Sequence, residues 1–180
     1  LLALIQPDNQ LDMVRSLVKM CEQGGVLPRW PSGYGYTGSM LGASADIMIT
    51  DTYLKGIRDF DVETVYRAMC KAALGTDPPK EGFKPRDGMS VCLQYQYCPD
   101  DMMDRSVSKT LEYAYADNAV ACLAKALGYE EDAKLFKEHS LYYRNVWNRE
   151  TQYFHPRNSG GEFVKKFKPL KLTYLDFDRE

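Results

Sequence analysis

The stretch from Ser106 to Ala124 is typical of a helix that carries small apolar residues on every side. Its apolar residues do not keep to one stripe: one side holds Leu111, Ala114, Ala119, Cys122 and Leu123, and another holds Val120 and Ala124. A helix that is apolar all round lies inside a larger structure. An isolated carboxylate is costly to bury. We therefore expect Glu112 to be ion-paired, hydrogen-bonded or turned toward a polar cavity.

Two kinds of helix alternate along the chain. Amphipathic patterns over residues 8–22, 61–75 and 129–147 alternate with small-residue patterns over 37–55 and 106–128. This alternation is typical of two concentric layers in which the inner helices are buried on both sides. The sequence therefore predicts an all-α fold of helical hairpins wound into a ring.

The remaining segments read as loops and short strands. Residues 26–36 are rich in Pro and Gly but dense in aromatic side chains, which is typical of a loop that lines a site. A mostly irregular stretch from Thr76 to Arg105 contains one candidate extended piece, Val91 to Tyr97. In the tail, a hairpin of short strands or extended loop is expected around the turn residues 158–161.

Composition narrows the classes of partner. The 23 basic and 25 acidic residues are mixed throughout, and the formal net charge is -2. Such a balance provides no electrostatic footprint for nucleic acid or for an anionic membrane. No apolar run is long enough to span a membrane, and no signal peptide is visible. The five cysteines form no Cys-x-x-Cys pair, and we interpret Cys21, Cys70 and Cys122 as small core residues.

Both ends of the sequence suggest an internal piece of a longer protein. The chain begins without Met at the apolar run Leu1 to Ile5, which resembles the end of a preceding helix. It stops at Glu180 without a terminating signal. Any targeting segment would then lie outside the 180 residues.

Arg29 and Trp30 are the most distinctive loop residues. An indole stacks on the apolar face of a pyranose, and a guanidinium offers fixed donors to its hydroxyls. The alternative is that Trp30 anchors the loop to the core. Beside it, Gly33-x-Gly35-x-x-Gly38 matches a dinucleotide fingerprint in letters only, because no strand precedes it and no βαβ unit surrounds it.

Three carboxylates on the small-residue helices are further candidates. Asp51 either pairs locally with Lys55 at i+4 or faces the cavity of the ring. Glu112 and Asp117 lie together with two tyrosines on an otherwise apolar helix, so they either face the cavity or belong to a buried polar network. The two histidines, His139 and His155, fall on elements predicted to be exposed, and we assign them no chemistry.

Several ordered motifs together resemble glycoside hydrolase family 92, the exo-acting α-mannosidases. They run through nearly the whole chain: Gly24-Gly25-Val26-Leu27-Pro28-Arg29-Trp30, Asp51-Thr52-Tyr53-Leu54-Lys55-Gly56-Ile57, Ser106 through Tyr115, Tyr143-Arg144-Asn145 and Phe154-His155-Pro156-Arg157. The resemblance implies an (α/α)6 toroid behind an N-terminal β-sandwich. It also implies calcium dependence and hydrolysis of terminal α-mannosides of glycans with inversion.

The resemblance places this chain, residues 1–180, in the middle of the catalytic domain. The β-sandwich and the C-terminal half of the toroid would lie outside it. The general acid is expected after Phe167-Lys168-Pro169, beyond Glu180, and the base and most calcium ligands later still. We therefore assign no catalytic residue and no metal ligand here, and expect the chain alone to be inactive.

The expected contribution of this chain is part of the wall that binds a mannose-containing glycan. The candidate contacts are Arg29 and Trp30, then Glu112 and Asp51, and finally Asp117. The full-length protein is expected outside the cytoplasm. Two other interpretations stay open: a non-catalytic helical scaffold that binds protein through the loop with Tyr34 and Tyr36, and a toroidal glycosidase with another sugar preference.

Overall fold

The computed structural model describes residues 1–33, 35–36, 40–76 and 85–168. Its helices are α1 (Leu2–Ile5), α2 (Pro7–Gly24), α3 (Ser44–Leu54), α4 (Val62–Leu74), α5 (Met89–Tyr95), α6 (Ser106–Leu127), α7 (Glu130–His139) and the 3-10 helix η1 (Tyr142–Val146). Two short antiparallel hairpins pair β1 (Pro31–Ser32) with β2 (Gly35–Tyr36) and β3 (Trp147–Asn148) with β4 (Tyr153–Phe154). Within these described residues, no helix is long and apolar enough to cross a membrane.

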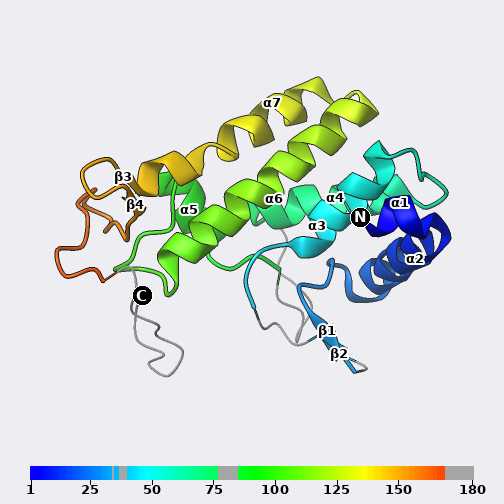
Figure 1. Cartoon of the computed structure of the whole chain (residues 1–180), viewed down its shortest axis with the longest axis horizontal. Coiled ribbons are helices and arrows are strands. Elements are labelled where there is room, and N and C mark those ends of the chain that lie inside the picture. Colours follow the sequence, from blue (N-terminus) through cyan, green and yellow to red (C-terminus); the bar gives the residue numbers. More distant parts are fainter. Residues whose placement is uncertain (34, 37–39, 77–84, 169–180) are drawn as a thin grey trace.

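The long helix α6 lies at the centre of the molecule. It packs against α3 on one side and against α7 on another, while α2 packs against α3, and α4 packs against α6 and α2 (Figure 1). The helices α3 and α6 therefore form one layer, and α2, α4 and α7 form a second. The prediction of an all-α fold in two layers is confirmed. The β3–β4 hairpin lies at one end of the molecule, whereas the β1–β2 hairpin projects from its side, below α3 (Figure 1).

Aliphatic side chains from both layers form the main core between them. Its fully buried members include Val14 from α2, Ile49 from α3, Val65 and Met69 from α4, Val120 and Leu123 from α6, and Phe136 from α7. Cys21 belongs to this core and Cys70 packs against it, as predicted. The same prediction was wrong for Cys122, which lies on the exposed side of α6.

The limits of α4 agree with the signals in the sequence. The Asp61 carboxylate accepts a hydrogen bond from the amide of Thr64 at 3.1 Å and caps the helix. At the other end, Gly75 adopts φ 63°, the left-handed conformation that terminates helices. Local chemistry was sufficient to predict this element.

Three predicted elements differ from the structure. Helix α3 begins at Ser44 instead of Thr37, because Met40 and Gly42 have φ values of 62° and 82° that a helix cannot accommodate; residues 37–39 lie outside the described ranges. The expected extended piece from Val91 to Tyr97 is instead mostly helix α5, which Gln96 ends in the left-handed conformation. The helix expected over 129–147 ends at His139 and continues as η1.

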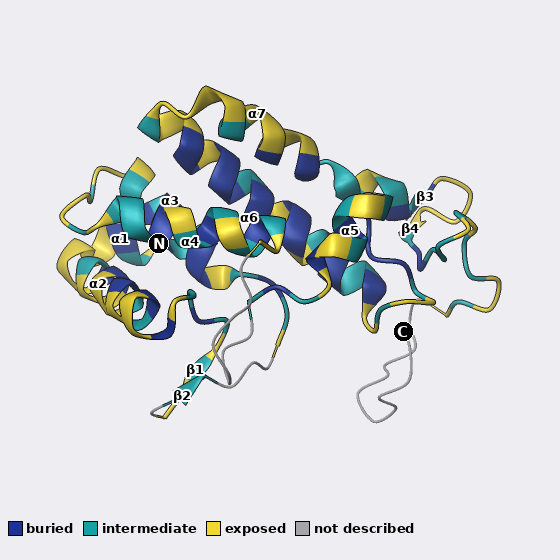
Figure 2. Cartoon of the chain, turned by 180° about the vertical axis from the view of Figure 1, so that it is seen from behind, coloured by how far each residue is buried: buried dark blue, intermediate teal, exposed yellow. Residues whose placement is uncertain are grey.

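One side of α6 is open to solvent, so the expectation that it is buried all round was wrong. Glu112, Tyr115 and Cys122 are exposed, whereas most of the remaining surface of the helix is buried (Figure 2). The exposed residues follow helical spacing and form one face. Glu112 therefore does not need a buried partner.

Polar contacts hold the C-terminal module, which we define as residues 142–167. The imidazole of His155 donates from Nε2 to the carbonyl of Val164 at 2.7 Å and accepts at Nδ1 from Asn148. Arg157 donates to the carbonyls of Gly161 and Asn145. The predicted exposure of His155 was therefore wrong, because the ring is the internal bridge of this module. The chain folds back around residues 158–161 as expected, but Arg157 and Phe163 form a single antiparallel bridge there, and β4 pairs with β3 and not across this turn.

Candidate functional site

Three charged side chains meet between the two inner helices. Asp46 lies in the first turn of α3, Asp117 lies in the middle of α6, and Arg86 comes from the loop before α5. Arg86 donates from Nη2 to Asp46 Oδ2 at 3.1 Å and from Nη1 to Asp117 Oδ1. Their side chains are only 1–4% exposed. We call these residues the buried triad.

Burial and charge act in opposite directions within the buried triad. Burial raises the pKa of the Asp46 carboxyl to about 6, although the neighbouring Arg86 guanidinium lowers it. Burial also raises the pKa of Asp117, again against the effect of Arg86. Burial disfavours the charge of Arg86, but the two carboxylates outweigh it and raise its pKa. One cation thus holds two carboxyl groups out of water.

The segment from Pro85 to Asp87 connects the buried triad with the loop that carries Arg29. Arg29 donates to the carbonyl of Pro85, to Asp87 Oδ2 at 3.3 Å, and to the carbonyl of Met40 at 2.8 Å. The Arg29 side chain is only 5% exposed. Its guanidinium therefore points into the protein and joins three loop segments.

Tyr113 on α6 holds the same segment from the opposite side. Its hydroxyl accepts from the amide of Asp87 at 2.9 Å and donates to the carbonyl of Asp87 at 3.1 Å. The Arg86 guanidinium lies over the Tyr113 ring, 5.7 Å from its centroid. Helix α6 therefore supports the segment with a backbone clamp as well as with Asp117.

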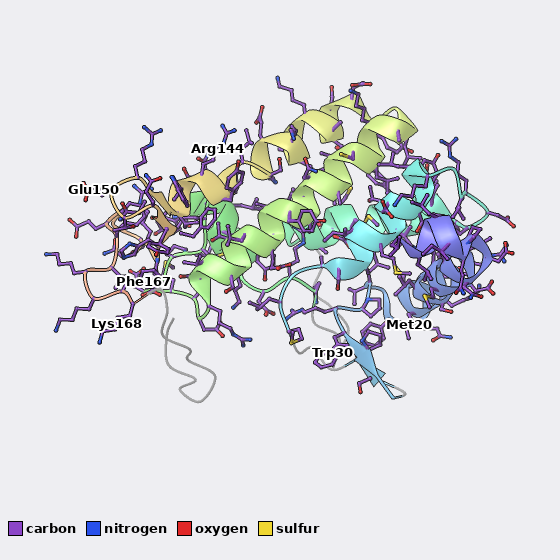
Figure 3. The ribbon with its side chains drawn as sticks, viewed as in Figure 1. Met20, Trp30, Arg144, Glu150, Phe167 and Lys168 are labelled. Carbon is purple, nitrogen blue, oxygen red and sulfur yellow. A yellow bond between two sulfur atoms is a disulfide. The ribbon has the colours of Figure 1, made fainter. Side chains whose placement is uncertain are left out.

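Trp30 differs from its neighbour Arg29 in orientation. It lies where the β1–β2 hairpin begins, is 51% exposed, and stands away from the helical layers (Figure 3). It is not an anchor buried in the core. The sugar contact predicted for Trp30 stays a prediction.

Glu112 lies against the loop that leads into α3. A Cβ at Gly42 would come within 2.6 Å of Glu112 Oε2, so only a glycine leaves space for the carboxylate there. Beside this contact is a small pocket of about 20 Å³, lined among others by Arg29, Gly42, Asp46, Pro85 and Arg86. Glu112 thus stands near the same loops that Arg29 joins.

The structure does not bring Asp51 into this group. Asp51 lies near the C-terminal end of α3, and Lys55 Nζ donates to its Oδ1 at 2.6 Å. Its side chain is 46% exposed. The local i+4 ion pair, one of the two alternatives open from the sequence, is formed.

Sequence reasoning missed Asp46 and Arg86 as members of a common network. The available signal was that Asp46 and Asp117 lie among small apolar residues, so that a buried carboxylate there would need an ion pair or hydrogen bonds. Nothing in the sequence indicates which of the 23 basic residues supplies it. Among the described residues, no group of three His, Cys, Asp or Glu side chains is placed to hold a metal ion.

His139 was expected to be exposed but is buried. It follows Phe136 by three residues and therefore shares the inward face of α7. Burial lowers the pKa of its imidazole, while Asp117 raises it. Together with Asp117 and Tyr113, His139 lines a second small pocket of about 10 Å³.

Comparison with known proteins gives a consistent family. Residues 1–178 match the sequence model of the glycosyl hydrolase family 92 catalytic domain. An uncharacterized secreted glycosidase from Arthroderma benhamiae is 32% identical over 151 residues, which are 75% of this chain and 18% of that protein.

Two solved structures from Bacteroides thetaiotaomicron share the fold. An inverting family 92 mannosidase has a TM-score of 0.83 at 27% identity, covering 90% of this chain and 22% of that one. A family 92 α-mannosidase in complex with mannoimidazole has a TM-score of 0.80 at 31% identity, covering 91% and 21%.

This chain spans about a fifth of the length of these relatives. The likeness to the two structures confirms that its helical hairpins form part of the predicted (α/α)6 toroid. With almost every residue inside one family match, the chain belongs to the catalytic domain of glycosyl hydrolase family 92.

Proposed function

We propose that this chain is a central segment of a calcium-dependent, inverting exo-α-mannosidase that hydrolyses terminal α-mannosides of glycans. The observation that carries the proposal is the family 92 match over residues 1–178. The likeness to the α-mannosidase in complex with mannoimidazole supports the substrate class. The likeness to the inverting mannosidase supports inversion of stereochemistry.

The proposed share of this segment is one wall of the sugar site. The exposed indole of Trp30 stacks on the apolar face of a mannose ring. The Glu112 carboxylate, exposed beside Gly42, accepts hydrogen bonds from hydroxyls. Arg29 supports this wall from the protein interior, because its guanidinium donates hydrogen bonds to Pro85, Asp87 and Met40.

The proton transfers of inversion are assigned to residues outside this chain. An inverting glycosidase needs an acid and a base roughly 6.5–9.5 Å apart across the scissile bond. Asp46 and Asp117 are buried and both bind Arg86, and Asp51 binds Lys55. We therefore expect the segment alone to be inactive.

The described residues do not fit a calcium site. Calcium takes six to eight oxygen ligands, usually with several carboxylates. The carboxylates of the loop before α6 already bind protein groups. Asp101 accepts a hydrogen bond from Ser159, and Asp104 accepts hydrogen bonds from Lys109 and Arg105. We propose that the calcium ligands of the whole protein lie outside the described residues.

An extracytoplasmic location is part of the proposal. The curated relative is described as secreted. Cys92 and Cys98 form a disulfide, and disulfides persist mainly in oxidising compartments. Both observations favour a secreted, surface or periplasmic protein.

The test uses the intact protein that carries this segment and an aryl α-mannoside substrate. We expect Trp30→Ala and Glu112→Gln each to lower kcat/KM about 10- to 100-fold, equivalent to about 1.4–2.8 kcal/mol. Two exposed residues of the C-terminal module provide matched controls: Tyr153→Ala for the aromatic and Glu150→Gln for the carboxylate. Wild-type kinetics in both site variants would refute the assignment of this wall.

A second assay tests the substrate class and the metal. We expect cleavage of the α-mannoside but not of matched aryl α-glucoside or α-galactoside, and loss of activity with a chelator that calcium reverses. Preference for another sugar would support a toroidal glycosidase of different specificity. Activity unaffected by the chelator would contradict calcium dependence.

A further inference from the structure

The ion pairs of the buried triad fix the position of the segment 85–87. The Arg86 side chain enters the space between α3 and α6 and is 1% exposed, and both of its carboxylate partners are nearly as buried. Removing one partner from a buried ion pair leaves an uncompensated charge, which is strongly destabilising. Arg86 therefore has one favourable position, and its neighbours in the chain are placed with it.

The same segment also holds the Arg29 side chain through hydrogen bonds. The Pro85 carbonyl and the Asp87 carboxylate both accept from Arg29 Nη2. Arg29 is covalently joined to Trp30, and its carbonyl accepts a hydrogen bond from Ser44 at 3.4 Å. A path of direct contacts thus leads from the buried triad through two residues of backbone to the base of the β1–β2 hairpin.

We propose that the buried triad of Asp46, Arg86 and Asp117 is a positioning device for the sugar wall: it fixes Pro85 and Asp87, which in turn fix Arg29 and the orientation of Trp30. The triad itself does not touch the sugar. The part concerning Trp30 rests on the proposed function, whereas the control of Arg29 does not.

Proteolysis of the intact protein tests the control of Arg29 without any use of activity. Trypsin must take an arginine side chain into its own pocket, so it cuts after Arg29 or Arg86 only when that side chain leaves its partners. We expect Asp46→Asn to accelerate cleavage after both residues about tenfold or more, because cleavage follows the open population. Mass spectrometry of the fragments identifies each bond.

Two internal references accompany this assay. Asp59→Asn removes the same charge from an exposed pair with Arg15 and should leave both rates unchanged. Cleavage after Lys109, whose side chain is 6% exposed on α6, reports unfolding of that helix and should also stay slow. Faster cleavage after Arg86 with a wild-type rate after Arg29 would overturn the proposal.

A second variant tests the proposal if Asp46→Asn accelerates cleavage after Arg29, Arg86 and Lys109 equally. Tyr113→Phe removes the hydroxyl that clamps the backbone of Asp87 and leaves every buried charge in place. We expect it to accelerate cleavage after Arg29 by several-fold, with Lys109 still protected. No acceleration after Arg29 in this variant would equally overturn the proposal.

A double-mutant cycle tests whether the buried triad acts through Trp30. In the wild-type background, Asp46→Asn should raise KM for an aryl α-mannoside about tenfold; in the Trp30→Ala background it should add less than about twofold. Fully additive effects would contradict transmission through Trp30. If Trp30→Ala itself has wild-type kinetics, the proposed sugar wall fails, while the proteolysis result still stands.

Discussion

The helical body, which we define as α2, α3, α4, α6 and α7, is held together differently from the C-terminal module. Interlocking aliphatic side chains such as Ile49 and Leu123 fill the body. Aromatic ring pairs such as Trp147–Phe154 and individual polar contacts hold the module. The polar contacts include the hydrogen bond from Tyr97 to the carbonyl of Asn158 and the two that Ser159 donates to Asp101. The stability of the body depends on the apolar area that each side chain buries, whereas that of a network of single contacts depends on each donor and acceptor.

The largest effect is expected in the core of the body. Phe136 is fully buried between the layers. We expect Phe136→Ala to lower the free energy of unfolding by about 3–5 kcal/mol through lost burial and a residual cavity. Leu135→Ala, one position away and 37% exposed, should change it by less than about 1 kcal/mol. Urea denaturation of the intact protein measures both, and equal losses would contradict the assignment of the core.

The buried triad should contribute a pH-dependent term to stability. The folded pKa of Asp46, about 6, exceeds its ordinary value of 3.8. The folded protein therefore holds this proton more tightly, and its contribution to stability, complete below about pH 4, is lost as the pH rises through 6. The expected loss is up to about 3 kcal/mol.

The difference between wild type and Asp46→Asn measures the part of this term that depends on Asp46, including its coupling to Asp117, whose pKa burial also raises. The pKa of His139 is lowered, so His139 makes the opposite contribution and destabilises the fold as the pH falls below its ordinary value of 6.5. It remains in both proteins and cancels in the difference. Denaturation midpoints from pH 4 to pH 8 measure the curve, and a flat difference would show that Asp46 does not titrate in this window.

A smaller effect is expected for the disulfide that supports the segment before α6. Cys92 and Cys98 are six residues apart and have a Cα–Cα distance of 4.7 Å. Replacing both by Ala should lower the free energy of unfolding by about 2 kcal/mol, as the entropy of a short closed loop predicts. Alkylation of the unreduced, denatured protein should modify Cys21, Cys70 and Cys122 only; modification of Cys92 would show that the bond is open.

The smallest effect concerns a helix end of the body. Asp61→Ala removes the side chain that caps α4 and should cost about 1 kcal/mol. Hydrogen bonds from Thr64 lower the pKa of Asp61, so this contribution disappears as the pH falls through that lowered value. Asp61→Asn should retain most of the stability, since Asn also caps helices well. Thermal melts at pH 7 compare the two variants.

The same contrast explains what could be predicted from the sequence. Apolar periodicity and local end signals were enough for α2 and α4, and the small apolar residues up to the stop at Gly128 were enough for α6. The segment from Val91 to Tyr97 was predicted to be extended, whereas in the structure Met89 and Cys92 are buried at helical spacing. A short segment of this kind is decided by tertiary contacts.

The site was predicted in its residues more than in its connections. The exposed Trp30 agrees with a role in binding, and Asp117 is in a buried network, one of the two alternatives open for it. The partner of Asp117 is 31 residues away in a loop, and no pattern links Arg86 to two helices. Long-range ion pairing leaves no local periodicity, so only the folded structure reveals it.

Because Gly42 has no side chain, the Glu112 carboxylate can lie against it, and a substitution at position 42 would change the proposed ligand surface. A methyl group at position 42 would clash with Glu112 Oε2, which it would meet at 2.6 Å. The backbone there has a φ of 82°, which glycine adopts more readily than other residues. The carboxylate would have to swing outward while its own helix kept its sequence. The reach of Glu112 into solvent is thus set by a residue that has no chemistry of its own.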